Sequence, residues 1–163
     1  MQLSTYIRTG FATVSILLAI VPAAGAAPTA TTKLSKSERT LLASINDVRA
    51  AHKLRPLRVD PTLVRAARAN STTMIGRNIF THGALGPRLA AHGVRGPLYG
   101  ENLAWGKGER GTAAGIVASW LRSPGHRANL LRPGWTRIGI GARVGAFQGH
   151  SGATVVTADF AGT

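Results

Sequence analysis

Cysteine, acidic residues and long apolar runs are absent or scarce in this chain of 163 residues. Without cysteine no disulfide can form, so the hydrophobic core alone must hold the fold together. Only six residues are acidic against twenty that are basic, which gives a formal net charge of +14. The longest apolar stretch, Phe11 to Val21, is too short to span a bilayer comfortably. With 44% hydrophobic residues, the chain has enough apolar material for one domain with its own core.

The excess of positive charge favours anionic partners, such as acidic cell-wall polymers, anionic lipid headgroups or nucleic acid. The basic residues are scattered and form no run of five or more, so a solvated, arginine-rich surface is the alternative interpretation. No nucleic-acid-binding module is recognisable in the sequence. We therefore expect a lipid or an anionic cell-wall polymer as the partner, and no nucleic acid.

Residues 1–26 have the pattern of a secretory signal peptide. Arg8 supplies a positive charge, the apolar stretch follows, and Ala24-Gly25-Ala26 forms an A-x-A cleavage pattern. Cleavage would take the net charge from +14 to +13, because Arg8 is the only charged residue in this segment. We expect residues 27–36 to be a linker and residues 37–163 to be a secreted or envelope-associated domain without a stable transmembrane segment. An uncleaved membrane anchor is the alternative.

Apolar periodicity predicts helices in the first part of the chain and strands near its end. Ser35 with Glu38 fits a capping box, and Asp60-Pro61 fits a helix start. The expected α+β elements are helices over 37–53, 61–76, 87–92, 112–122 and 124–131, a strand over 102–105, and a hairpin of 138–144 with 154–160 around a turn at 148–152.

Two histidines and one glutamate stand beside glycines or one residue from them: His82, Glu101 and His126. Because acids are so scarce, a carboxylate between Gly100 and Asn102 is not ordinary surface decoration. Two imidazoles and a carboxylate suit Zn²⁺ or another divalent cation, with a water in the fourth position. No local metal motif is present, so such a site depends wholly on the fold. The alternative is that each side chain only hydrogen-bonds its own loop.

The segments Gly100-Glu101-Asn102 and Ser123 to Leu131, in this order, resemble the CAP superfamily (cysteine-rich secretory proteins, antigen 5, pathogenesis-related 1) in its bacterial, cysteine-free branch. The resemblance runs from about Leu41 to Gly162. It implies a three-layer α-β-α sandwich with a mostly antiparallel central sheet. It also implies that His82, Glu101 and His126 share one central cavity as catalytic residues or metal ligands.

Ser123 departs from the family pattern, because many members have a second glutamate at this position, three residues after Trp120. A hydroxyl cannot replace a carboxylate as a base, which weakens cation binding and acid/base chemistry. We expect Asn102, Tyr99 and Ser123 to support the cavity. The favoured function is a binding module for a small apolar ligand, lipid or cell-wall polymer. The alternative is a metal-assisted extracellular hydrolase of the peptidase type.

Overall fold

The computed structural model describes residues 32–162, so the predicted signal peptide and the first part of the predicted linker lie outside the described residues. The elements along the chain are α1 (Lys36–Ala51), β1 (Arg58–Val59), α2 (Pro61–Arg77), α3 (Leu85–Ala91), β2 (Leu98–Gly106), the 3₁₀ helix η1 (Gly108–Gly111), α4 (Ala113–Arg122), α5 (Pro124–Leu130), β3 (Trp135–Phe147) and β4 (His150–Gly162).

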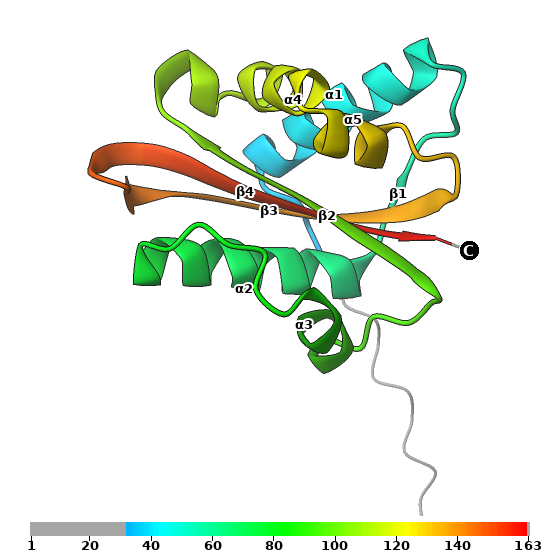
Figure 1. Ribbon diagram of the computed structural model, residues 1–163, viewed down its shortest axis with the longest axis horizontal. Helices are drawn as coiled ribbons and strands as arrows, with labels where there is room; N and C mark the ends of the chain where they lie inside the picture. Colours follow the sequence, from blue (N-terminus) through cyan, green and yellow to red (C-terminus); the bar gives the residue numbers. More distant parts are fainter. Residues whose placement is uncertain (1–31, 163) are drawn as a thin grey trace, which may run out of the picture. The chain divides into compact units, whose positions relative to one another are not determined.

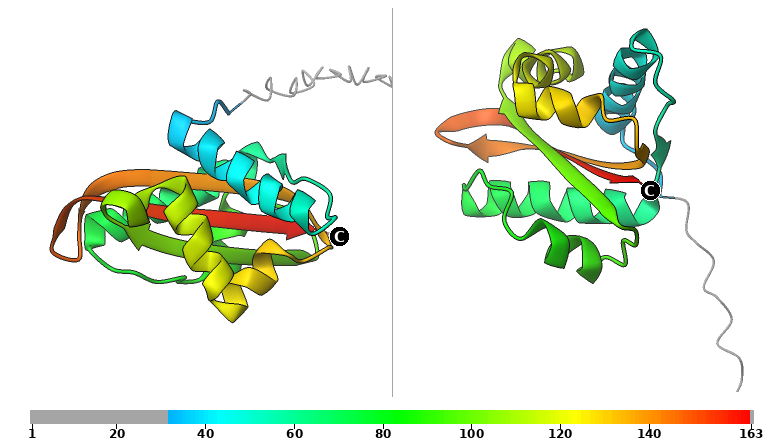
Figure 2. Two further views of the ribbon diagram at one scale, coloured as in Figure 1. Left: turned by 90° about the horizontal axis from the view of Figure 1, so that it is seen from above. Right: turned by 45° about the vertical axis from the view of Figure 1, so that its right-hand side comes forward.

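The sheet lies between two layers of helices (Figure 1): α1, α4 and α5 cover one face, and α2 and α3 cover the other. Its strand order is β1-β3-β4-β2. Figure 2 shows α1, α4 and α5 from above, lying across the strands. The predicted α+β class and three-layer sandwich are confirmed. The prediction of a mostly antiparallel sheet needs correction to a mixed sheet, because the two-residue strand β1 pairs parallel with β3.

Both predicted helix starts have the expected hydrogen bonds. At the start of α1, the Ser35 hydroxyl accepts from the backbone N–H of Glu38, whose carboxylate accepts from the N–H of Ser35 at 2.8 Å. At the start of α2, the Asp60 carboxylate accepts from the backbone N–H groups of Thr62 and Leu63. These caps supply partners for N–H groups that a helix leaves unpaired at its first turn.

Glycine lets α2 lie directly on the sheet. A Cβ atom on Gly139 would overlap the backbone carbon of Leu63, and one on Gly141 would overlap that of Ala67. Any larger residue at these positions of β3 would push the helix away. The glycines that alternate with Ile138 in the predicted strand pattern therefore also set the distance between α2 and the sheet.

Several strand limits differ from the predictions. β2 begins at Leu98 rather than at residue 102, so Glu101 lies within a strand and not in a loop. The hairpin turn is only Gln148 and Gly149, and β4 already begins at His150. The Gly- and Pro-rich composition before Glu101 favours a loop, but pairing of β2 with β4 from Leu98 onward overrides that local preference.

Candidate functional site

Glu101 of β2 lies directly opposite Asp159 of β4 in the antiparallel register. Opposed residues on neighbouring strands project from the same face of a sheet, so the two carboxyl groups are neighbours. Both are buried, with 5% of Glu101 and 0% of Asp159 exposed. Two buried carboxylates repel each other and lose their hydration, so they need a counter-ion.

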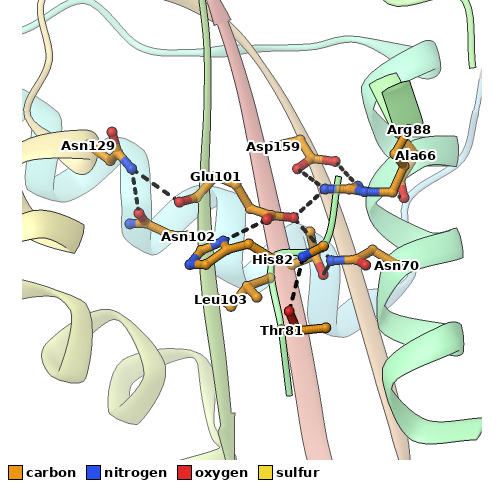
Figure 3. Close-up of polar contacts among 12 residues, drawn as sticks. Ala66, Asn70, Thr81, His82, Arg88, Glu101, Asn102, Leu103, Asn129 and Asp159 are labelled. Carbon is orange, nitrogen blue, oxygen red and sulfur yellow. Dashed lines mark hydrogen bonds and ion pairs between the residues drawn. The ribbon is translucent and has the colours of Figure 1, made fainter. Parts of the chain in front are cut away.

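Arg88 of α3 supplies this counter-ion to both acids (Figure 3). Its Nη1 donates to Oδ2 of Asp159 at 2.8 Å, and its Nη2 donates to Oδ1 at 3.2 Å. Nη2 also donates to Oε2 of Glu101, which accepts a further hydrogen bond from Nδ2 of Asn70 at 3.1 Å. One guanidinium therefore spans two carboxylates. We call Arg88, Glu101 and Asp159 the shared-arginine cluster.

His82 lies against the other oxygen of Glu101, with Nδ1 2.7 Å from Oε1. An ionised carboxylate only accepts hydrogen bonds, so Nδ1 of His82 is the donor to Glu101 wherever Glu101 is ionised. The side chain of His82 is 58% exposed, whereas that of Glu101 is 1% exposed. A buried carboxylate thus orients an imidazole that solvent can reach.

His126 lies in α5, near enough to His82 to feel its charge. Partial burial lowers the pKa of His126, and the charge of His82 lowers it further. The backbone carbonyl of His126 accepts a hydrogen bond from Nδ2 of Asn102 at 3.0 Å. Asn102 in turn accepts from Asn129, which also donates to the backbone carbonyl of Glu101 at 3.1 Å. These amides tie α5 to β2.

Tyr99 and Ser123 lie beside these elements rather than among the charged groups. Tyr99 is half-buried and packs on the small apolar cluster that includes Leu89 of α3. Ser123 joins α4 to α5 and precedes Pro124; its backbone carbonyl accepts from the N–H of Arg127 at 2.8 Å. The supporting role predicted for Asn102 therefore has specific contacts, and the shared site of His82, Glu101 and His126 stays a prediction.

The ratio of two acids to one arginine sets the protonation of the shared-arginine cluster. Burial raises the pKa of Asp159 to about 7, and Arg88 opposes this rise. Burial also raises the pKa of Glu101 above its ordinary value, again against the effect of Arg88. Both raised pKa values reduce the negative charge with which the cluster could attract a cation.

Sequence reasoning misses Asp159, Arg88 and Asn70. Asp159 had a usable signal, since it is one of only six acids and stands between Ala158 and Phe160 in an apolar strand. Arg88 had none, because it is one of twenty basic residues. Its place in the cluster follows only from the position of α3.

The predicted divalent cation finds few free ligands in this arrangement. Each oxygen of Glu101 already has a hydrogen-bonding partner, so His82 and His126 are the groups with capacity left for a metal. Within residues 32–162, no group of three or more His, Asp or Glu side chains is placed to hold a metal ion. Usual catalytic zinc sites have three protein ligands. The cation stays a prediction.

Four clefts lie elsewhere on the domain. The first, of about 580 Å³, is lined by the N-terminal turn of α1, by residues 111–113, and by Ala142, Val144 and Thr154; we call it the α1–α4 groove. A cleft of about 590 Å³ lies beside Arg55 and Arg58, another of about 620 Å³ beside Leu34 and Val59, and one of about 200 Å³ beside Trp105 and His150. None of the four is lined by His82, Glu101 or His126, so the predicted central cavity stays a prediction.

Comparison with known proteins identifies the family. The family model described as the Cysteine-rich secretory protein family, CAP, matches residues 42–160. The chain belongs to the CAP family. Its lack of cysteine and its Bacillus relatives confirm the bacterial, cysteine-free branch. The fold of this CAP domain, the predicted α-β-α sandwich, agrees with that membership.

Two curated relatives come from Bacillus subtilis. The CAP domain is 35% identical over 117 residues to the uncharacterized protein YkwD of Bacillus subtilis, covering 69% of this chain and 44% of YkwD. It is 36% identical over 110 residues to the uncharacterized membrane protein YlbC of the same organism, covering 64% of this chain and 31% of YlbC. The chain therefore spans less than half the length of these curated relatives.

Solved structures share the fold. An extracellular protein with an SCP domain from Bacillus anthracis superposes with a TM-score of 0.66 at 28% identity, covering 78% of this chain and 40% of that one. An outer surface protein of Borrelia burgdorferi superposes with a TM-score of 0.65 at 22% identity, covering 80% of this chain and 96% of that one. The CAP domain is thus of a type found in extracellular proteins. No helix within residues 32–162 is long and apolar enough to cross a membrane.

Proposed function

We propose that this protein is an exported binding module that holds an anionic single-chain lipid, such as a fatty acid, in the α1–α4 groove. The groove itself is the observation that carries the proposal. Its volume of about 580 Å³ falls within the usual range for small-ligand sites, and Leu41, Ala113 and Ala142 form an apolar wall. It is bounded by helices and strands, so a ligand would meet a preformed surface.

The polar groups of the groove support an anionic headgroup. Lys36 lies at the rim, is exposed, and forms no ion pair within residues 32–162. The hydroxyl-bearing residues Ser37, Thr40 and Thr112 lie beside it. An ammonium group next to hydroxyls can hold a carboxylate at the water-exposed mouth while the acyl chain lies on the apolar wall.

The pairing of Glu101 favours binding over hydrolysis. One oxygen of Glu101 accepts from His82 and the other from Arg88 and Asn70, so both oxygens are already engaged and Glu101 is a weaker base toward water. Ser123 replaces the second glutamate of the family pattern. In this proposal Glu101 orients His82, and a divalent cation, if bound, would be held by His82 and His126 on the exposed side.

We also propose that the protein acts outside the cytoplasm, as a secreted or envelope-associated protein. The signal-peptide pattern of residues 1–26 supports this location. The extracellular Bacillus anthracis protein of similar fold supports it as well. A fusion of residues 1–26 to a reporter enzyme tests it, and retention of the reporter in the cytoplasm contradicts it.

Displacement of a fluorescent fatty acid from the purified chain tests the groove. Val144 is 71% exposed and lines the groove; Val144→Glu brings a charge to the apolar wall and should weaken binding about tenfold or more. Ile79→Glu is the matched control, because Ile79 is 52% exposed but does not line the groove. Equal losses in both variants, or no displacement with the unaltered chain, contradict the proposal.

The headgroup assignment has its own test. Lys36→Gln should weaken the binding of a fatty acid by about threefold and leave the binding of a fatty alcohol of the same length unaffected, because only the acid carries the paired charge.

An esterase and peptidase screen, with and without zinc, tests the alternative function as an enzyme. Turnover that disappears when His82→Ala is combined with His126→Ala would replace the binding module by a hydrolase.

A further inference from the structure

Two of the four large hydrophobic residues that are exposed in residues 32–162 are neighbours in the chain at one end of the domain. These are Ile79 and Phe80, exposed by 52% and 43%; the other two are Val59 in β1 and Val144, which lines the α1–α4 groove. We call this end the hairpin end and define it by residues 77–80, 105–110 and 147–150. Figure 1 shows its three parts together at the left: the end of α2, the end of β2 with η1, and the turn between β3 and β4.

The apolar residues of the hairpin end are held in place. The backbone N–H of Gln148 donates to Oδ1 of Asn78 at 2.7 Å, and Nε2 of Gln148 donates to the carbonyl of Asn78 at 2.8 Å. The Phe80 ring meets the buried Phe147 ring edge-on, with centroids 6.4 Å apart. Ile79 and Phe80 thus remain exposed on a braced segment, which is the mark of an interaction surface.

An aromatic row continues across the hairpin end. Trp105 packs edge-on against Phe147 at 5.6 Å, and the His150 ring also lies 5.6 Å from Trp105. Of the three tryptophans, only Trp105 is partly exposed, because Trp120 and Trp135 are 0% and 2% exposed. Tryptophan and phenylalanine beside water are typical of the boundary between a membrane and water.

The segments of the hairpin end also carry positive charge. Arg77, Lys107 and Arg110 are exposed, and none forms an ion pair within the described residues. Glu109 is the one acid in the three segments. Exposed apolar side chains together with unpaired cations fit an anionic lipid surface. The apolar side chains enter the headgroup region, and the cations contact the anionic headgroups.

We propose that the hairpin end docks the protein on an anionic membrane surface. Ile79 and Phe80 enter the headgroup boundary, Trp105 lies level with the headgroups, and Lys107 and Arg110 contact them. The α1–α4 groove opens beside this end at Gly111 and Val144, so a docked domain would hold the groove close to the lipids. The docking itself does not depend on what the groove binds.

Cosedimentation of the purified chain with lipid vesicles tests the docking. Vesicles of phosphatidylcholine mixed with phosphatidylglycerol should retain the protein, and vesicles of phosphatidylcholine alone should retain far less. Ile79→Ser combined with Phe80→Ser should lower partitioning about tenfold, because two large apolar side chains are lost from the interface. Val59→Ser, at an exposed apolar residue outside the hairpin end, is the control and should leave partitioning within about twofold.

Two matched double variants test the contribution of positive charge to the docking. Lys107→Gln with Arg110→Gln should lower partitioning about tenfold. Arg55→Gln with Arg58→Gln removes the same charge from an exposed cleft elsewhere and should have a much smaller effect. Equal losses for the two pairs would mean non-specific attraction by the net charge and would overturn the proposal, as would no binding to either vesicle.

Fluorescence of Trp105 gives a second readout. Vesicles with brominated acyl chains should quench the bound protein, and Trp105→Phe should remove most of that quenching, because the other tryptophans are buried. Quenching that persists in Trp105→Phe would place another face on the membrane and overturn the proposal.

Fatty-acid displacement in solution needs no vesicle, and Ile79→Ser with Phe80→Ser should leave it unchanged. Failure of docking is therefore distinguishable from failure of the groove.

Discussion

Glu38 and Asp60 are buried acids that each have an arginine of their own, whereas Glu101 and Asp159 share one. Glu38 pairs with Arg68 and has Arg143 at 3.8 Å, and Asp60 pairs with Arg137. Burial raises the pKa of Glu38, but hydrogen bonds, led by that of Arg68, outweigh it and lower the pKa. For Asp60, hydrogen bonds from Thr62 and Arg137 do the same. In the shared-arginine cluster burial wins, and the pKa of each acid rises.

The comparison explains the shortage of acids in this chain. Four of its six acidic residues are buried, and all four pair with arginine. Scarcity of acids therefore marks buried ion pairs in general here, and only the unequal ratio at Glu101 and Asp159 marks a special place. A carboxylate in a chain with few acids is therefore not functional merely because acids are scarce, since the few acids include structural ones.

Replacing Arg88 should give the largest effect. Arg88→Met keeps much of the aliphatic stem but leaves Glu101 and Asp159 without a counter-ion, which should lower the free energy of unfolding by about 3–5 kcal/mol near neutral pH. The loss should shrink near pH 5, because Asp159, whose pKa is about 7, then binds a proton and no longer needs the counter-ion. Denaturant unfolding at the two pH values measures this.

Arg68→Met is the control for that experiment. Glu38 would still accept from the N–H of Ser35, and Arg143 lies 3.8 Å away, so the loss should be about 1–2 kcal/mol. A loss as large as that of Arg88→Met would mean that the ratio of acids to arginines is not what distinguishes the two regions.

Asp159→Asn should remove a pH dependence. The folded-state pKa of Asp159, about 7, lies above the ordinary value of 3.8, so the folded protein binds the extra proton between these values. The contribution of Asp159 to stability is full below about pH 4 and is lost as the pH rises through 7. The variant should therefore gain about 2–4 kcal/mol over the unaltered protein at pH 7, and almost nothing at pH 4. Parallel stability curves for the two proteins would refute this.

Glu38→Gln should have the opposite pH dependence. The pKa of Glu38 is lowered in the folded state, so its stabilisation is present above the ordinary value of 4.5 and is lost as the pH falls through the folded-state pKa. The variant should lose about 1–3 kcal/mol at pH 7 and match the unaltered protein in acid. Thermal unfolding across pH measures the difference, and a loss that persists in acid would point to packing instead of charge.

Combining His82→Ala with His126→Ala should have the smallest effect on stability, below about 1 kcal/mol, because His82 is mostly exposed. Zinc calorimetry on the same variant addresses the predicted cation. Two imidazoles should give weak binding that disappears in the double variant. Tight binding in the unaltered protein would show that further ligands join, and heat that survives in the variant would place the cation elsewhere.

Local signals predicted much of the fold. The capping residues Ser35 and Asp60 predicted the starts of α1 and α2, because a cap acts within three residues of itself. The strand limits were less predictable. Glycines before Glu101 indicated a loop, and only the pairing with β4 shows that they belong to β2.

By itself the sequence determined the family, because two short motifs carry the resemblance, and that resemblance implied the three-layer sandwich and singled out Glu101 as a candidate site residue. Tertiary structure alone decided what Glu101 contacts. The register of β2 with β4 brings Asp159 beside it, and the placement of α3 selects Arg88 from twenty basic residues. Charge pairing acts over a few ångströms in space but across 71 residues from Arg88 to Asp159, a separation that sequence patterns do not encode.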